Sequence, residues 1–467
     1  MRNAEAPDGA GPREEGSDLP PWPSASKGST RAPGVSNRVP NGAPNGVHSR
    51  GSRPEPERVQ WSALIRLGLV VAAGLVVARL FGALATVLVV LALVVMVLLH
   101  EFGHFIVAKL SGMQVTEFFF GFGTRLWTIK RGETTYGIKA LPFGGYCRIT
   151  GMTSAEEVAP DDEPRAYRNQ ATYKRVAVAC AGSAVHFMLA FLMLFALFIG
   201  PGDMGNFEAV PASNPIASVD GFGQAKSPAE LAGLAAGDRI LALNGRHFST
   251  WNEMTAYIKA RPDQKVAITF ESHGRVSTSS VVLANGAKVH LTGMSGPLYS
   301  TPTGLLGVEE GPVRYGFFGS ILHAGAAVGN TVASSVTSVG RVVGNVSGYA
   351  KMVESPKAAD GPHAVRFVSP VGVVVLAHET TQVGISYVLW LLILINIFVG
   401  VFNMIPLLPL DGGHVAIALY EKVRSLRSKT PYHADVNKLA PVIYAALALI
   451  LFYGATSLFM DLRQVLS

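Results

Sequence analysis

Apolar and polar stretches alternate along this chain, and several apolar stretches are as long as a membrane-spanning helix. The first covers residues 62–110, is almost continuously apolar, and is broken by Arg66 and Arg79. Because one spanning helix needs about 20 apolar residues, this stretch predicts two helices, over 63–80 and 84–109. The first of them has the shorter uncharged run, so it is also compatible with a place at the membrane interface.

Three later stretches are also apolar enough to span a membrane, at 176–199, 387–408 and 440–458. With 84–109 they predict four core transmembrane helices, and the segment at 63–80 adds a further N-terminal one. The fold class that follows is a polytopic α-helical membrane protein.

Residues 111–172 alternate apolar and polar positions and are punctuated by glycines, which predicts short β-hairpins. Within them, the segment 142–146 reads Pro-Phe-Gly-Gly-Tyr and includes Gly144 and Gly145. This segment suits a β-loop that lies against the membrane core. An ordinary hairpin turn explains it equally well.

Residues 201–300 have the polar composition of a soluble domain. The segment 232–245 predicts a helix end, a Gly-Asp turn, a strand and an Asn-Gly hairpin turn in succession. A short helix over 251–260 and a strand over 265–270 follow. This order resembles a PDZ domain of the bacterial protease type, which implies an inserted α+β domain that adds a peptide strand to its sheet edge. A spacer or size filter with the same fold is the alternative.

Two further segments carry weaker patterns. Residues 1–58 are rich in Pro, Gly, Ser and Arg and nearly lack large aliphatic side chains, which predicts a disordered tail. Phe317–Val353 mixes apolar and small polar residues and predicts an amphipathic helix on the membrane surface. Ser369-Pro370-Val371-Gly372 predicts a turn before an apolar patch.

Composition and charge place these segments relative to a membrane. The chain has 467 residues, of which 49% are hydrophobic and 15% charged, and this is too apolar for an ordinary soluble enzyme. The net charge is +7, with ten basic residues in 109–175 and five in 422–438. Because basic loops stay in the cytoplasm, we expect both loops and the N-terminal tail there, and 201–384 outside. We expect no cleavable signal peptide, no nucleic-acid binding, and free thiols at Cys147 and Cys180.

Near the end of the second apolar helix the sequence reads His100-Glu101-Phe102-Gly103-His104. Two histidines four residues apart lie on one face of a helix and can bind one metal ion. Glu101 can then serve as general base on a metal-bound water. Ionisable side chains deep in an apolar helix are costly and mark functional sites. A chance match in composition remains an alternative unless a third ligand exists.

That ligand is predicted at 403–414, which reads Asn-Met-Ile-Pro-Leu-Leu-Pro-Leu-Asp-Gly-Gly-His. Its two prolines break a helix at membrane depth, where irregular backbone is tolerated only against protein or water. Zn²⁺ held by two histidines needs a third protein ligand and leaves a fourth position for water. Asp411 meets this need. A lone Asp-Gly is more usually an N-cap or a turn, which is the alternative.

With both halves in view, residues 84–460 resemble the site-2 protease family of intramembrane zinc metalloproteases. The likeness is greatest to bacterial members that cut anti-sigma factors. The resemblance implies that His100, His104 and Asp411 bind Zn²⁺ and that Glu101 activates water.

The resemblance also bears on the surroundings of the metal. It implies that Asn403 contacts the substrate backbone or the developing oxyanion, whereas a helix-packing hydrogen bond is the alternative. Gly144 and Gly145 belong to the hairpin edge that we expect to pair with an unwound substrate. The family pattern would usually carry Pro at Ser183 and Asn at His186. We therefore expect His186 near the active site, either as a hydrogen-bonded packing residue or as a group that makes activity pH-sensitive.

These patterns predict an intramembrane zinc metalloprotease of the bacterial plasma membrane, acting in regulated intramembrane proteolysis. Its substrate would be a transmembrane protein, such as a single-pass anti-sigma factor, already cut by another protease. The new C-terminus could bind to the PDZ-like domain. An inactive PDZ-bearing scaffold and an ion-binding transporter are the competing functions, although no inverted repeat favours the transporter.

The predicted segments are a disordered cytoplasmic tail (1–60), two transmembrane helices (61–110), a cytoplasmic membrane-associated β-hairpin region (111–172), a transmembrane helix (173–200), the extracytoplasmic PDZ-like domain (201–300), an extracytoplasmic region with the amphipathic helix (301–384), and the last two transmembrane helices (385–467).

Overall fold

Five long helices follow the apolar stretches of the sequence in a computed structural model. The helices are α1 (Trp61–Leu80), α2 (Leu84–Leu110), α3 (Thr172–Ile199), α10 (Ile385–Asn403) and α12 (Ala440–Leu466). The structure describes residues 61–80, 82–152, 156–222, 225–290, 298–344, 367–428, 432–434 and 436–466. The predicted tail at 1–60 and the end of the predicted amphipathic helix, 345–353, lie outside the described residues.

Four of these helices, α2, α3, α10 and α12, are long and apolar enough to cross a membrane. They correspond to the four core helices that the hydrophobic pattern predicts. In α1 the side chains of most residues before Val71 lie outside the described part, and within that part Val71–Leu80 is a shorter apolar helix.

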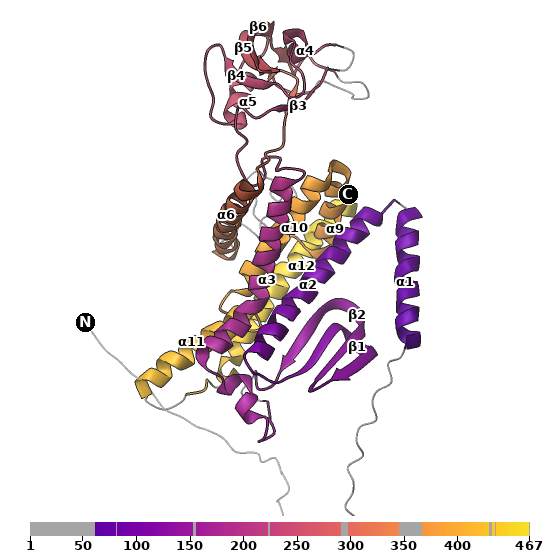
Figure 1. Cartoon of the computed structure of the whole chain (residues 1–467), viewed down its shortest axis with the longest axis vertical. Coiled ribbons are helices and arrows are strands. Elements are labelled where there is room, and N and C mark those ends of the chain that lie inside the picture. Colours follow the sequence, from indigo (N-terminus) through magenta and orange to yellow (C-terminus); the bar gives the residue numbers. More distant parts are fainter. Residues whose placement is uncertain are drawn as a thin grey trace, which may run out of the picture. The chain divides into compact units, whose positions relative to one another are not determined.

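Helices α2, α3 and α10 run side by side and form the centre of the bundle (Figure 1). A further helix, α6 (Phe317–Gly344), packs against α3 and α10. The predicted amphipathic helix therefore has a face against the bundle. The fully buried side chains of this interface are Ala190, Leu194 and Phe198 of α3, Ala324 of α6, and Ile393 and Ile397 of α10.

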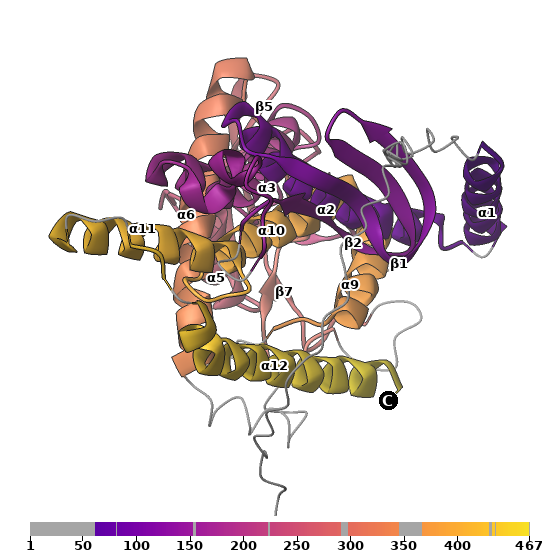
Figure 2. The same ribbon diagram turned by 90° about the horizontal axis from the view of Figure 1, so that it is seen from below.

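Two long strands, β1 (Val115–Arg131) and β2 (Thr134–Ile149), follow α2 and pair antiparallel beside it (Figure 2). The segment 117–120 of β1 pairs with both 135–138 and 145–148, so the two strands bend and form more than one ladder. Gly121 has a φ of 85°, a backbone conformation that only glycine adopts readily. The predicted series of short hairpins is therefore one bent pair, because such glycines bend the strands without ending them.

Residues 203–315 fold around a hydrophobic core of their own, with Leu243, Met254 and Ile268 at its centre. Asn244 and Gly245 both have positive φ, as a two-residue hairpin turn requires. The pairing of β9 with β3 extends this unit past the predicted boundary at residue 300. Its elements are β3 (Ile216–Val219), α4 (Pro228–Ala232), β4 (Arg239–Leu243), α5 (Trp251–Lys259), β5 (Lys265–Ser272), β6 (Arg275–Val282), β7 (Ala284–Asn285), β8 (Gly304–Leu305) and β9 (Val308–Glu310).

Two helices were not predicted. Ser369 does not begin a simple turn: its side chain accepts a hydrogen bond from the Gly372 N–H and caps α9 (Pro370–Val383). Helix α11 (Asp411–Ser428) begins at the predicted metal ligand. Three short 3₁₀ helices complete the described part: η1 (Glu163–Arg165), η2 (Tyr167–Asn169) and η3 (Val436–Leu439).

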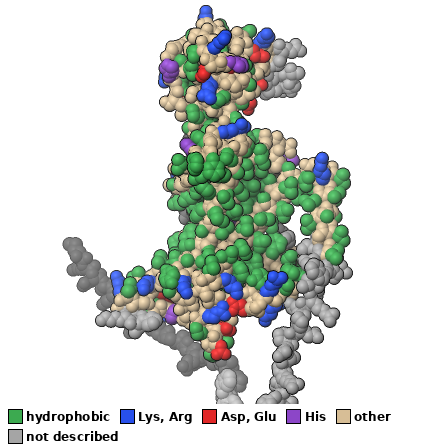
Figure 3. All heavy atoms as spheres, viewed as in Figure 1, with side chains coloured by type: hydrophobic (Ala, Val, Ile, Leu, Met, Phe, Trp, Pro, Cys, Tyr) green, Lys and Arg blue, Asp and Glu red, His purple; other side chains and the backbone are tan. Residues whose placement is uncertain are grey.

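Hydrophobic side chains cover the helical part of the surface, as expected of helices in contact with lipid (Figure 3). Lys and Arg side chains gather below it, over α11 and over the loops near the bent sheet (Figure 3). This distribution agrees with the two basic loops found in the sequence.

Candidate active site

Helix α2 brings two imidazoles together at the predicted position. The Nε2 atoms of His100 and His104 are 3.2 Å apart, and both residues are buried. The Nδ1 atom of His104 donates a hydrogen bond of 2.7 Å to the carbonyl of Val178 on α3. Because a carbonyl can only accept, this bond fixes the proton on Nδ1 and leaves the Nε2 lone pair free for a metal.

Asp411 joins this pair from the start of α11. Its Oδ2 atom lies 3.3 Å from the Nε2 of His100 and 3.3 Å from the Nε2 of His104. Two glycines make the approach possible. A Cβ on Gly412 would clash with the Met404 carbonyl, and one on Gly413 would lie 2.6 Å from the Leu408 nitrogen.

These three donors fit the requirements of Zn²⁺. Tetrahedral Zn²⁺ with ligand distances near 2.05 Å separates its ligand atoms by about 3.3 Å, close to the spacing of this cluster. Two imidazoles and a carboxylate are also a donor set that Zn²⁺ uses. Within the described residues, Asp411 Oδ2 is buried without a hydrogen-bond partner, which suits an atom reserved for a metal.

Helix α3 approaches the cluster through Gly182, a residue that the sequence reasoning missed. A Cβ at this position would clash with His100 Cε1 and lie 2.5 Å from His104 Nε2. Gly103 on α2 makes a reciprocal contact, because a Cβ there would lie 2.8 Å from the Ala181 carbonyl. The signal that could have revealed this contact is the run of small residues over 179–184.

Glu101 lies beside the two histidines and faces the bent sheet. Its carboxylate lies near the backbone N–H of Cys147 on β2. A Cβ on Gly145 would lie 3.6 Å from Glu101 Cγ, so this strand passes close to the Glu101 side chain. Gly144 precedes it with a φ of 93° and lies near Phe122 and Val97. The structure thus brings the predicted hairpin edge to the predicted base.

The other two predicted residues have different surroundings. Asn403 is the last residue of α10 and is partly exposed, and no hydrogen bond of its side chain is found among the described residues. His186 is buried, and its ring centre is 5.0 Å from that of His100. Its Nδ1 atom pairs with Asn396 Oδ1 at 2.9 Å. This buried amide of α10 was also missed, although a lone Asn in an apolar helix is itself a signal.

A helix-borne His/Glu/His motif with a carboxylate beside it, set among helices of membrane-spanning length, is typical of membrane-embedded zinc metalloproteases. Comparison with known families agrees. The chain belongs to peptidase family M50, whose family model matches residues 88–451. It is therefore a zinc metalloprotease of the intramembrane, site-2 protease type, with Zn²⁺ as its cofactor.

Curated relatives match over most of the chain. The zinc metalloprotease Rip1 of Mycobacterium tuberculosis is 33% identical over 406 residues, which cover 80% of this chain and 96% of that protein. Rip1 of Mycolicibacterium smegmatis is 32% identical over 421 residues, covering 83% of this chain and 99% of that protein. A putative zinc metalloprotease of Clostridium acetobutylicum is 27% identical over 339 residues, covering 72% and 87%.

Two solved structures match a small part of the chain. The PDZ domain of an SdrC-like protein from Listeria monocytogenes covers 17% of this chain at 22% identity, with a TM-score of 0.15. The PDZ domain of an SdrC-like protein from Listeria innocua covers 21% at 21% identity, with a TM-score of 0.17. At such scores the PDZ-like character of 201–300 stays a prediction.

Proposed function

We propose that His100, His104 and Asp411 bind the zinc ion of this protease and that Glu101 is its general base. The observation that carries the proposal is the spacing of 3.2–3.3 Å among the three ligand atoms, which come from two helices far apart in sequence. The bound metal supplies Lewis acidity, which activates water for attack on a peptide carbonyl. Glu101 takes the proton of that water and returns it to the leaving amine.

The substrate is a peptide bond within or beside a transmembrane segment. A helical substrate hides its backbone amides in i→i−4 hydrogen bonds, so it must unwind locally before attack. The strand that carries Gly144 and Gly145 supports this step, since it passes close to Glu101 and offers backbone groups for pairing. Asn403 then donates its amide to the substrate backbone or to the oxyanion.

The physiological substrate is a single-pass regulator such as an anti-sigma factor, first cut by another protease. The 201–300 domain lies outside the cytoplasm and binds the new C-terminus or excludes uncut proteins. The basic loops and the N-terminal tail lie in the cytoplasm. Support for this arrangement comes from the distribution of Lys and Arg along the sequence.

Replacing Glu101 by Gln tests the mechanism, because it removes the base and leaves the three ligands in place. Cleavage of a model transmembrane substrate should fall by at least about 100-fold while the zinc content of the purified protein stays the same. Asp411→Asn should instead reduce the zinc content. Wild-type cleavage by Glu101→Gln would refute the assignment of the base, and wild-type zinc content in Asp411→Asn would refute that of the ligand.

A further inference from the structure

The residues of α3 that contact the site lie on one face of the helix. Arg175, Val178, Gly182 and His186 follow one another at spacings of three and four residues, so they share one face of the helix. Val178 accepts the hydrogen bond that orients His104, and Gly182 faces both histidines. Arg175, at the start of this face, contacts none of the predicted zinc ligands.

Arg175 instead pairs with Glu421 on α11. Its Nη1 atom lies 2.6 Å from Glu421 Oε2, and each side chain is only 8% exposed. The other carboxylate oxygen of Glu421 accepts a hydrogen bond of 2.6 Å from the Ala434 N–H. The Arg175 guanidinium also lies over the ring of Tyr167, 5.1 Å from its centre. A buried pair with this many contacts holds two helices in one arrangement.

The face of α11 that holds this ion pair is also the face that holds Asp411. Asp411, His414, Ala418 and Glu421 recur at spacings of three and four residues and form one stripe. His414 packs edge-on against Tyr167, with ring centres 6.4 Å apart, and Ala418 is fully buried. The opposite face is exposed at positions 419, 420 and 423.

We propose that Arg175 and Glu421 are positioning residues that set the orientation of Asp411 toward the zinc ion. Ten residues of helix separate Asp411 from Glu421 by about 15 Å, so a tilt of about 4° at the ion pair moves Asp411 by about 1 Å. A metal site tolerates displacements of about 0.5 Å. Helix α3 thereby aligns both halves of the site, His104 through Val178 and Asp411 through Arg175.

Zinc affinity of the full-length purified protein tests this proposal, which rests on the proposed ligand role of Asp411. Glu421→Gln and Arg175→Gln should each raise the zinc Kd, measured by chelator competition, by about 10- to 100-fold. The absorption spectrum of the Co²⁺-substituted protein should change with it, because the geometry of the ligands changes. Arg175→Lys keeps a cation beside Glu421 and should recover part of the affinity.

The matched control is Asp263→Asn, which removes the carboxylate of an ion pair with Lys288, because both residues lie between 203 and 315, outside the helices that carry the site. Its zinc Kd should equal that of the wild type. A folded Glu421→Gln protein with wild-type zinc Kd and Co²⁺ spectrum overturns the proposal. If that variant does not fold, Glu421→Asp keeps the charge and withdraws the carboxylate, and an unchanged zinc Kd in this variant overturns it equally.

A third variant separates this proposal from the proposed function. If Asp411→Asn keeps its zinc, the ligand assignment itself fails. If Asp411→Asn loses zinc while Glu421→Gln retains it, the ligand assignment stands and only the positioning role fails.

Discussion

The close approach of α3 to both histidines depends on Gly182. A Cβ at this position would clash with His100 and lie 2.5 Å from the Nε2 of His104. We therefore expect Gly182→Ala to displace the imidazoles and raise the zinc Kd by at least about tenfold, measured by chelator competition.

Gly454→Ala is the matched control, because Gly454 lies in α12 with no atom within 4 Å of its would-be Cβ. Alanine favours a helix over glycine by about 1 kcal/mol, so this control should be neutral or slightly stabilising and keep its zinc. Equal zinc affinity in the two variants would show that α3 can move away from the histidines without harm to the site.

His186 illustrates how a residue beside the proposed metal site can act on stability. It is buried and pairs with Asn396 Oδ1, while the amide nitrogen of Asn396 donates to the Leu392 carbonyl. His186→Ala would leave Asn396 Oδ1 unsatisfied in an apolar bundle, and we expect a loss of about 1–3 kcal/mol in the free energy of unfolding. Thermal unfolding in detergent measures this loss. An unchanged midpoint would mean that the hydrogen bond contributes nothing, which favours a role in catalysis for the imidazole.

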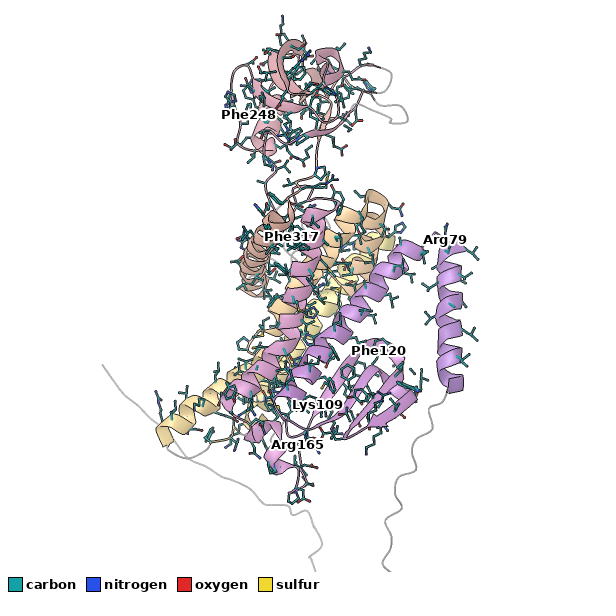
Figure 4. The ribbon with its side chains drawn as sticks, viewed as in Figure 1. Arg79, Lys109, Phe120, Arg165, Phe248 and Phe317 are labelled. Carbon is teal, nitrogen blue, oxygen red and sulfur yellow. The ribbon has the colours of Figure 1, made fainter. Side chains whose placement is uncertain are left out.

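At the scale of elements, the carboxylate of Glu133 connects the bent sheet to the end of α2. Glu133, in the turn between β1 and β2, forms a bidentate pair with Arg165 and also contacts Lys109 at 2.5 Å. Lys109 and Arg165 lie close together at this end of the molecule (Figure 4). This attachment matters for function, since the same sheet carries the strand that passes close to Glu101.

The Glu133 attachment makes stability depend on pH. The hydrogen bond from Arg165, together with Lys109, lowers the pKa of Glu133 from 4.5 to about 2. A carboxyl whose pKa is lower in the folded state stabilises that state fully above pH 4.5, and this contribution is lost as the pH falls toward 2. The midpoint of thermal unfolding should therefore fall more steeply between pH 5 and pH 3 in the wild type than in Glu133→Gln. Parallel profiles would contradict this role.

The elements also show what the sequence could and could not predict. The positions of His100 and His104 follow from helix periodicity, a local property, and Asp411 followed from the ligand count of zinc. Helix α11 was missed because Gly412 and Gly413 at its start are poor helix formers. Glycine is required at both positions because the backbone of Met404 and Leu408 lies too close for a Cβ. No local sequence pattern reveals these contacts.

The supporting contacts of the site depend on which faces of distant helices meet. Val178 and Gly182 lie in a run of small and apolar residues that is typical of an ordinary spanning helix, and Arg175 directly precedes this run. Their roles follow only from the packing of α3 against α2 and α11. Likewise, alternation and glycines predicted strands over 111–172, but the bent register of β1 and β2 is set by pairing across the sheet.

At the scale of the whole molecule, the membrane decides which parts share a compartment. The basic residues at 109–175 and 422–438 flank spanning helices, and such loops stay in the cytoplasm. In the proposed orientation a single span, α3, separates 109–175 from 201–300, so the two regions lie on opposite sides of the membrane. We therefore expect a cysteine at Arg427, on α11, to be reached only from the cytoplasm, and one at Ser277, on β6, only from outside.

Labelling of intact cells with a membrane-impermeant maleimide measures this directly. Both positions are exposed, so access depends on sidedness and not on burial. The background needs Cys147→Ala and Cys180→Ala, because both native thiols are free. Burial raises the pKa of Cys147 to about 12, so in a protein that keeps this cysteine its thiol should react slowly with the maleimide. The introduced thiols are exposed and should react at the ordinary rate. Labelling of Ser277→Cys in intact cells, with Arg427→Cys labelled only after lysis, supports the proposed orientation. The reverse pattern would place the 201–300 domain in the cytoplasm, where it could not meet a substrate cut outside the cell.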